Sequence, residues 1–196
     1  MASSKIEVLA QEASGCRRCD LWRDATQVVF GEGPATAPVV VVGEQPGDQE
    51  DRSGKPFVGP AGREFDRALA EAGIARQRLY LTNAVKHFKW KPRGKRRIHE
   101  RPNRAEIVAC KDWLRAELQL VRPGVIVTLG ATAGQSLLGG SFRVGPARGA
   151  NLDFEGTPVV ATIHPSAILR ATGPARAASF ADLVADLSRA ATIGRP

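Results

Sequence analysis

The sequence predicts an α/β fold: a three-layer αβα sandwich around a central, mainly parallel sheet of four strands. Stretches typical of buried strands alternate along the chain with stretches of helical periodicity. The strand-like stretches are continuous apolar runs, as expected where helices cover both faces of a parallel sheet. At 196 residues, 43% of them hydrophobic and 24% charged, the chain is expected to form a single domain over residues 1–196.

The predicted elements follow in order. A short helix at residues 1–13 precedes the β-branched strand at 38–43. The helix at 59–73 has apolar residues at helical spacing and ends in glycine. A second strand at 78–85 leads into a long amphipathic helix at 104–121. The remaining elements are strands at 124–130 and 158–165, a short helix at 131–139, a small hairpin at 151–156 and a closing helix at 178–191.

The chain is strongly basic, with 28 Lys and Arg against 20 Asp and Glu and a formal net charge of +8. This charge favours a polyanionic partner, nucleic acid rather than membrane, because no basic amphipathic helix with a bulky apolar face is evident. The apolar runs are too short to cross a bilayer, and the first residues lack the apolar core of a signal peptide. Three cysteines do not make a disulfide framework. We expect a cytoplasmic monomer that does not associate with membranes.

Four polar segments lie where the predicted strands end, which is where ligands of parallel α/β sheets bind. GEQPGDQEDRSGKPFVGPAG follows the first strand, TNAVKH ends the second and HPS ends the last. The basic segment GKRRIHERPN, residues 94–103, has no apolar periodicity and is bracketed by glycine and proline, which predicts a loop. We expect all four segments to surround one cleft.

Single residues in these segments have a structural and a functional interpretation. Carboxylates such as Glu44 and Asp48 would cap a helix, or would stabilise a positive centre or position water. Phe57 is a core side chain or a platform for a planar ligand. Asn83 braces a loop or pairs with the edge of an amide-like base, and His164 braces a turn or donates to an anionic leaving group.

His99 lies among Lys95, Arg96 and Arg97. It is part of a solvated charge run, or it is a functional group that this basic segment carries. Ser166, near the start of the helix that follows HPS, can hold a phosphate.

The cysteines suggest a metal. Cys16 and Cys19 form a CxxC motif, CRRC, and Cys110 lies on the long predicted helix. Of the three histidines, His87 just beyond the second strand is the natural fourth ligand. Two cysteines, a histidine and a third cysteine fit either structural zinc or an iron–sulfur cluster. The alternative for Cys110 is a buried thiol packed on the apolar stripe of its helix.

Taken together, GEQPGDQED, GKPFVGPAG, TNAVKH and HPS, with the CxxC motif and the downstream cysteine, resemble the iron–sulfur uracil-DNA glycosylases. The motifs follow the family's order over roughly residues 15–190. The basic insert GKRRIH is similar to the loop of the UdgX subgroup, whose members link covalently to uracil-containing DNA.

The resemblance implies a [4Fe-4S] cluster on Cys16, Cys19, His87 and Cys110. Most relatives have a cysteine at the position of His87, which makes the histidine a departure from the family pattern and accounts for the odd cysteine count.

The resemblance also implies roles in catalysis. Uracil would stack on Phe57 and be read by Asn83, while His164 would stabilise the departing uracil anion. Glu44 would offer charge to the sugar cation, and His99 would capture it. Further substrate contacts are expected from Gly43, Gln45 and Asp48, and DNA contacts from Lys95, Arg96, Arg97 and Ser166.

The expected function is therefore excision of uracil from DNA, preferably single-stranded because base flipping then costs least, followed by a covalent bond from His99 to C1′. The basic flank of residues 95–97 would keep His99 unprotonated by charge repulsion. One alternative is a uracil-DNA glycosylase that turns over conventionally, and another is a metal-bearing DNA-binding module without chemistry.

Overall fold

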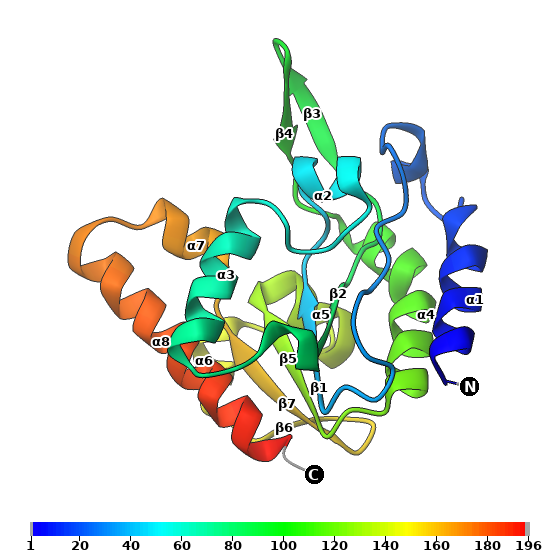
Figure 1. Cartoon of the computed structure of the whole chain (residues 1–196). Coiled ribbons are helices and arrows are strands. Elements are labelled where there is room, and N and C mark those ends of the chain that lie inside the picture. Colours follow the sequence, from blue (N-terminus) through cyan, green and yellow to red (C-terminus); the bar gives the residue numbers. More distant parts are fainter. Residues whose placement is uncertain (1, 195–196) are drawn as a thin grey trace.

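The computed structural model describes residues 2–194 and has three layers, with a central sheet between two layers of helices (Figure 1). The sheet has five strands in the order β2-β1-β5-β7-β6. The four strands from β2 to β7 pair in parallel, and β6 pairs with β7 in antiparallel. These strands are β1 (Val39–Gly43), β2 (Leu79–Asn83), β5 (Val125–Leu129), β6 (Leu152–Phe154) and β7 (Thr157–Thr162). The predicted fold class is confirmed, with five strands rather than four.

The fifth strand comes from the small hairpin predicted at residues 151–156. Glu155 and Gly156 both have positive φ, 52° and 85°, as two-residue hairpin turns require. The chain therefore reverses tightly, and Leu152 pairs with Val159 on β7. The count of four was wrong because this hairpin extends the sheet instead of standing beside it.

The central strand β1 explains the apolar run in the sequence. Val41 pairs with Leu81 on one side and with Val127 on the other, so β1 has a neighbour along both edges. Because side chains alternate along a strand, Val40 and Val42 pack on one face and Val39 and Val41 on the other. Both faces are buried, and a polar residue would find no solvent on either.

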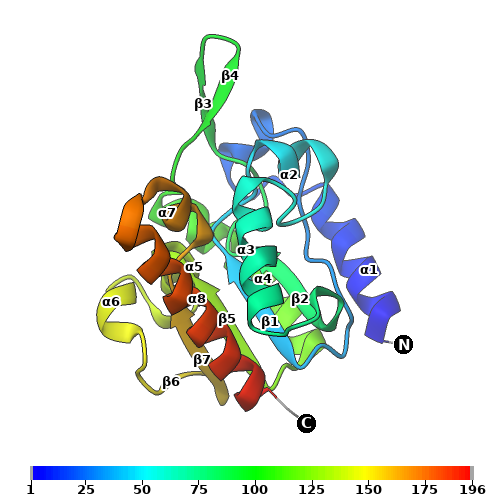
Figure 2. The same cartoon turned by 60° about the vertical axis from the view of Figure 1, so that its left-hand side comes forward.

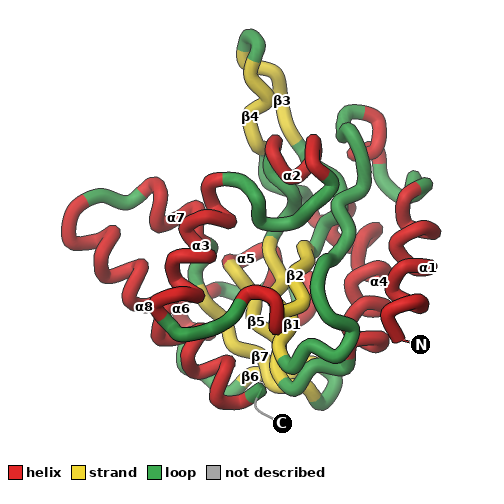
Figure 3. The backbone as a smooth tube through the Cα atoms, in the orientation of Figure 1, coloured by secondary structure: helices red, strands yellow, loops and turns green. Residues whose placement is uncertain are grey.

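The helices cover both faces of this sheet (Figures 2 and 3). α1 (Ala2–Ser14), α4 (Arg104–Val121) and α5 (Gly130–Leu138) contribute to the core on one face. α3 (Pro60–Glu71), α7 (Pro165–Arg170) and α8 (Gly173–Ile193) contribute to the core on the other. No helix in the described part of the chain is long and apolar enough to cross a membrane. The shorter helices are α2 (Asp48–Ser53), α6 (Val144–Ala147) and the 3-10 turns η1 (Asp20–Arg23) and η2 (Arg76–Arg78).

The basic segment predicted as a loop is in fact one arm of a β-hairpin that projects from the carboxyl end of the sheet (Figure 1). β3 (Trp90–Arg93) pairs in antiparallel with β4 (Arg96–His99), and Trp90 lies opposite His99. Gly94, with φ of 58°, begins the turn. The loop prediction was wrong because most of the hairpin is exposed or half-buried, so no apolar face marks its strands in the sequence.

Candidate active site

A cavity of about 880 Å³ opens at the carboxyl ends of the parallel strands. It collects side chains from all four polar segments, as the sequence predicts for one shared cleft. The predicted site residues that line it are Glu44, Gln45, Asp48, Phe57, Asn83, His99, His164 and Ser166.

Two glycines shape the floor of this cavity. Phe57 is buried, packs against Phe65 with ring centroids 5.4 Å apart, and has a φ of 57°. A Cβ at position 62 would collide with the backbone carbonyl of Phe57. A Cβ at Gly43 would collide with Asn83 Oδ1 and lie 2.8 Å from Phe57 Cζ. An aromatic residue with left-handed backbone geometry is strained, and such strain is concentrated at functional sites. The Phe57 ring and the Asn83 amide therefore meet at the floor, where only glycine at positions 43 and 62 leaves room for them.

His164 stands at the start of α7, and its protonation state follows from its contacts. Nδ1 accepts a hydrogen bond from the backbone N–H of Ser166 at 3.1 Å. The neutral ring therefore carries its proton on Nε2. Burial, with smaller contributions from His99 and Arg170, lowers the pKa of His164 to about 4. His164 is thus a neutral donor in the cavity wall near neutral pH.

Ser166 is engaged by the same turn. Its Oγ lies 2.8 Å from His164 Nδ1 and accepts a hydrogen bond from Arg170 at 3.2 Å. The hydroxyl predicted to hold a phosphate thus has two partners within the protein.

Glu44 and His99 lie close together in the wall of the cavity. His99 Nε2 lies 3.4 Å from Glu44 Oε1. Thr132 donates a hydrogen bond to Glu44 Oε2, and Arg101 Nε lies 3.9 Å from the same oxygen. Neither Thr132 nor Arg101 was predicted as a site residue. Thr132 lies on α5, 88 residues from Glu44, so nothing in the local sequence indicates their contact.

The pKa of His99 is lowered, and the cause differs from the one that the sequence suggested. Partial loss of solvent is the largest cause, the charge of Arg170 adds to it, and Glu44 opposes both. The basic flank of residues 95–97 is not among the causes. A lowered pKa leaves the imidazole neutral, with a free lone pair, near neutral pH.

The hairpin that carries His99 is braced by Gln45. Its Nε2 donates to the carbonyls of Lys89 and Glu100 at 3.1 and 3.0 Å, and its Oε1 accepts from the Lys89 amide at 3.2 Å. Lys89 precedes β3 and Glu100 follows β4, so the buried side-chain amide of Gln45 links the two ends of the hairpin. Gln45 was predicted to contact substrate, whereas its side chain is occupied in holding the hairpin.

Arg97 fastens the hairpin to α2. Its Nε donates to Asp48 at 2.5 Å and its Nη1 to the buried Asp51 at 2.6 Å. The guanidinium also lies 5.3 and 5.4 Å from the ring centroids of Phe88 and Trp90. Arg97 was predicted to contact DNA and Asp48 to contact substrate; in the structure the two side chains form an ion pair, and Asp48 also lines the cavity. Lys95 and Arg96, by contrast, are exposed at the hairpin tip, and within residues 2–194 neither forms an ion pair.

The chain matches the model of the uracil DNA glycosylase superfamily over residues 30–188. It belongs to that superfamily. It is 38% identical over 167 residues to the Type-4 uracil-DNA glycosylase of Thermotoga maritima, covering 84% of this chain and 83% of that protein. It is 36% identical over 172 residues to the Type-4 uracil-DNA glycosylase of Archaeoglobus fulgidus, with 84% and 83% covered. A Type-5 uracil-DNA glycosylase of Pyrobaculum aerophilum is 30% identical over 185 residues, with 86% and 78% covered.

The three cysteines of this superfamily member lie on one side of the sheet, away from the cavity. Cys16 and Cys19 are half-buried and pack with the buried Cys110 on the core cluster that includes α1 and α4. Trp113 Nε1 donates to Cys16 Sγ at 3.2 Å. Burial, with small contributions from Cys19 and Cys16 and opposed by Lys86, raises the pKa of Cys110 to about 11.

His87 is buried, and the residue before it in the chain contacts one of these thiols. The amide of the preceding Lys86 donates to Cys110 Sγ at 3.2 Å. Burial lowers the pKa of His87, which keeps its ring neutral, as a metal ligand must be. Among the described residues, however, no three His, Cys, Asp or Glu side chains converge on the position of a single metal ion. Three thiols and one neutral imidazole are donor types that fit an iron–sulfur cluster as well as structural zinc.

Proposed function

We propose that this protein is a uracil-DNA glycosylase that excises uracil from DNA and is then captured by a covalent bond between His99 Nε2 and C1′ of the sugar. The observation that carries the proposal is the 3.4 Å approach of His99 Nε2 to Glu44 Oε1 inside a cavity that suits a flipped base. The likeness of GKRRIH to the UdgX loop and the similarity to Type-4 relatives support it.

The cavity floor selects and releases the base. Uracil stacks on the ring of Phe57, and the Asn83 amide pairs with its Watson–Crick edge, an arrangement that cytosine does not satisfy. When the bond between N1 and C1′ breaks, its electron pair leaves with uracil. The Nε2–H of neutral His164 donates to the resulting anion without itself being charged.

The opposite wall receives the sugar. Loss of the base leaves an oxocarbenium-like centre at C1′, and the carboxylate of Glu44 stabilises that positive charge. The Nε2 lone pair of His99 then forms a bond to C1′, and the imidazole becomes a cation next to Glu44. The uracil anion takes a proton from solvent, which balances the reaction.

DNA is held outside the cavity by exposed cations. Lys95 and Arg96 at the hairpin tip are available to phosphates, because they have no partner among the described residues. Single-stranded DNA is the preferred substrate because extrusion of its bases costs least.

Cys16, Cys19, His87 and Cys110 would hold a [4Fe-4S] cluster, which supplies a redox-capable cross-link between the segment after α1, the end of β2 and α4. No residue of the catalytic cavity depends on it for the steps above. Purified protein should be brown, with broad absorbance near ~400 nm, as expected for iron–sulfur clusters. Colourless protein that contains zinc would contradict the cluster.

The decisive experiment incubates the protein with a uracil-containing single strand and separates the products under denaturing conditions, with a thymine-containing strand as the matched control. We expect a protein–DNA band that survives heat and SDS only with uracil. His99→Ser should lose this band and instead release uracil, because water enters the space of the ring and attacks C1′.

The outcomes separate the alternatives. Free abasic product with repeated turnover by the unmodified chain would identify a conventional glycosylase. DNA binding with neither uracil release nor adduct would identify a non-catalytic module. Loss of both excision and capture in His99→Ser would place His99 before glycosidic cleavage and overturn its role as a late nucleophile.

A further inference from the structure

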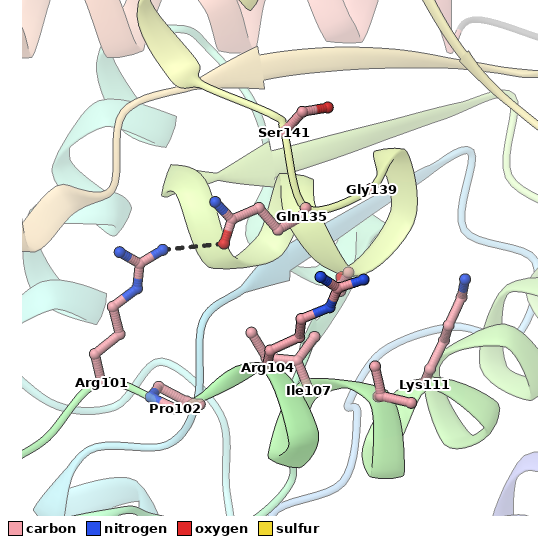
Figure 4. A pocket seen from close by; sticks show the side chains of 11 residues that line it. Arg101, Pro102, Arg104, Ile107, Lys111, Gln135, Gly139 and Ser141 are labelled. Atoms are coloured by element: carbon pink, nitrogen blue, oxygen red, sulfur yellow. Dashed lines mark hydrogen bonds between the residues drawn. The ribbon is translucent and has the colours of Figure 1, made fainter.

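A second cavity of about 640 Å³ adjoins the candidate active site (Figure 4). It lies between the N-terminal half of α4 and the C-terminal end of α5 and is called here the α4–α5 groove. Arg101 lines both this groove and the catalytic cavity, so the two form a continuous path across the surface. Figure 4 shows Arg104 and Lys111 projecting from α4 and Gln135 facing Arg101 from α5.

The charged side chains that line the groove are basic. Arg101, Arg104 and Lys111 line it, and no Asp or Glu does. Arg101 is held in place, because its Nη2 donates to Gln135 Oε1 at 3.1 Å and its Nε to Thr132 Oγ1 at 3.1 Å. Within residues 2–194, Arg104 and Lys111 form no ion pair. Two cations on α4 that form no ion pair therefore share the groove with Arg101, which is fixed at the edge of the active site and lies 3.9 Å from Glu44 there.

Apolar surface runs along the same groove. Val108 is 61% exposed, although it lies one turn from both Arg104 and Lys111 on α4. Ile107 and Pro102 also line the groove toward Arg101, but both are buried, so Val108 is the exposed apolar side chain of the three. A nucleic-acid single strand presents phosphates together with apolar sugar and base faces, so it matches a groove with cations beside an exposed apolar side chain.

We infer that the α4–α5 groove binds the backbone of the DNA strand on one side of the target uracil. This inference rests on the proposed function, since it takes the base to occupy the catalytic cavity. The strand leaves that cavity in two directions, and the groove lies in only one of them, beyond Arg101. Nucleotides on that side should add affinity through Arg104 and Lys111, and nucleotides on the other side should not.

The test uses a charge-reversed pair, Arg104→Glu with Lys111→Glu, and a matched control pair, Lys5→Glu with Arg78→Glu. Both residues are exposed. Lys5 lies on α1, and Arg78 precedes β2 at the end of the sheet opposite the cavity. Each reversal removes two charges, so both pairs lower the formal net charge from +8 to +4. The control thus reproduces any effect of overall charge, and thermal unfolding of each variant confirms that it folds.

Binding is measured by fluorescence anisotropy with single strands that carry 2′-fluoro-2′-deoxyuridine. The electron-withdrawing fluorine disfavours the oxocarbenium-like state, so the strand binds without reacting. A minimal strand is compared with strands extended only on the 5′ side or only on the 3′ side. We expect extension on one side to tighten binding, and the Arg104/Lys111 variant to lose that gain while the control variant keeps it. The salt dependence of binding to that strand should become shallower by ~1.4 in log–log slope, about 0.7 for each lost phosphate contact.

Retention of the one-sided gain by the Arg104/Lys111 variant, or equal losses in both variants, would overturn the inference. The inference would also be overturned if 5′ and 3′ extensions tightened binding equally and both variants kept that gain. Uracil release from ordinary deoxyuridine is measured in parallel. If the protein releases no uracil but the one-sided gain still depends on Arg104 and Lys111, the proposed function fails while the groove is supported.

Discussion

The two walls of the catalytic cavity are built in different ways. The floor carries Asn83 and His164 at the ends of core strands and Phe57 on the loop before α3, and buried apolar residues pack behind all three. The opposite wall carries His99 on a projecting hairpin, held chiefly by the polar contacts of Gln45 and Arg97. Packing positions the groups that bind and release the base, whereas a few hydrogen bonds and ion pairs position the group proposed to capture the sugar. The two functions should therefore be separable.

The largest expected effect comes from the floor. Gly43→Ala places a methyl group against Asn83 Oδ1 and Phe57 Cζ, so the amide and the ring must move apart. Excision should fall by about 10²-fold or more, the loss that a displacement of about 1 Å can cause. Uracil release in single-turnover reactions measures this loss. Capture should fall with it, because no sugar cation forms.

Gly73→Ala is a suitable comparison, since nothing lies within 4 Å of a Cβ at Gly73. Its positive φ makes that substitution costly for stability, but the cavity is untouched. Unchanged excision by Gly43→Ala would show that the base does not use the space between Asn83 and Phe57.

A smaller effect is expected at the opposite wall. Gln45→Ala removes the amide that closes the base of the hairpin, and His99 becomes less well positioned. Capture should slow by about tenfold, equivalent to about 1.4 kcal/mol or one net hydrogen bond, while uracil release stays near the parent rate. Time courses of adduct and of free uracil in the same reaction distinguish the two steps.

Gln27→Ala provides the matched control. Gln27 also donates its side-chain amide to two backbone carbonyls, those of Asp51 and Arg52, but it does not touch the hairpin. If both variants slowed capture equally, or if Gln45→Ala slowed uracil release as much as capture, the two walls would not be independent.

The smallest effect expected under ordinary conditions is that of pH. His99 captures the sugar only as a neutral ring, and its pKa lies below the ordinary histidine value of 6.5. The rate of capture should therefore be highest at high pH and fall on acidification with a midpoint below 6.5. A midpoint above 6.5 would mean that Glu44 dominates over loss of solvent and Arg170. Adduct formation is measured across the pH range, with uracil release by His99→Ser as the reference for the cavity floor.

The sequence by itself determined the layered fold and the place of the site. Continuous apolar runs such as residues 39–42 have no polar side to offer, so they specify strands covered on both faces. Parallel strands end at one edge, and polar segments that follow each of them must therefore meet there. For this reason Glu44, Asn83 and His164 could be assigned to one cleft from their positions in the chain.

Only the tertiary structure decided what holds His99. The β3–β4 hairpin lacks an apolar face, so its pairing depends on contacts with Gln45 and α2, made across 44 to 55 residues of chain. Gln45 and Arg97 have the residue types of ligand contacts, and nothing local distinguishes a side chain that binds DNA from one that braces the protein. The hydrogen bond from Thr132 to Glu44 spans 88 residues and arises from the packing of α5 near the end of β1. Periodicity reports which residues are buried, whereas the partner of a polar side chain depends on which elements come together in space.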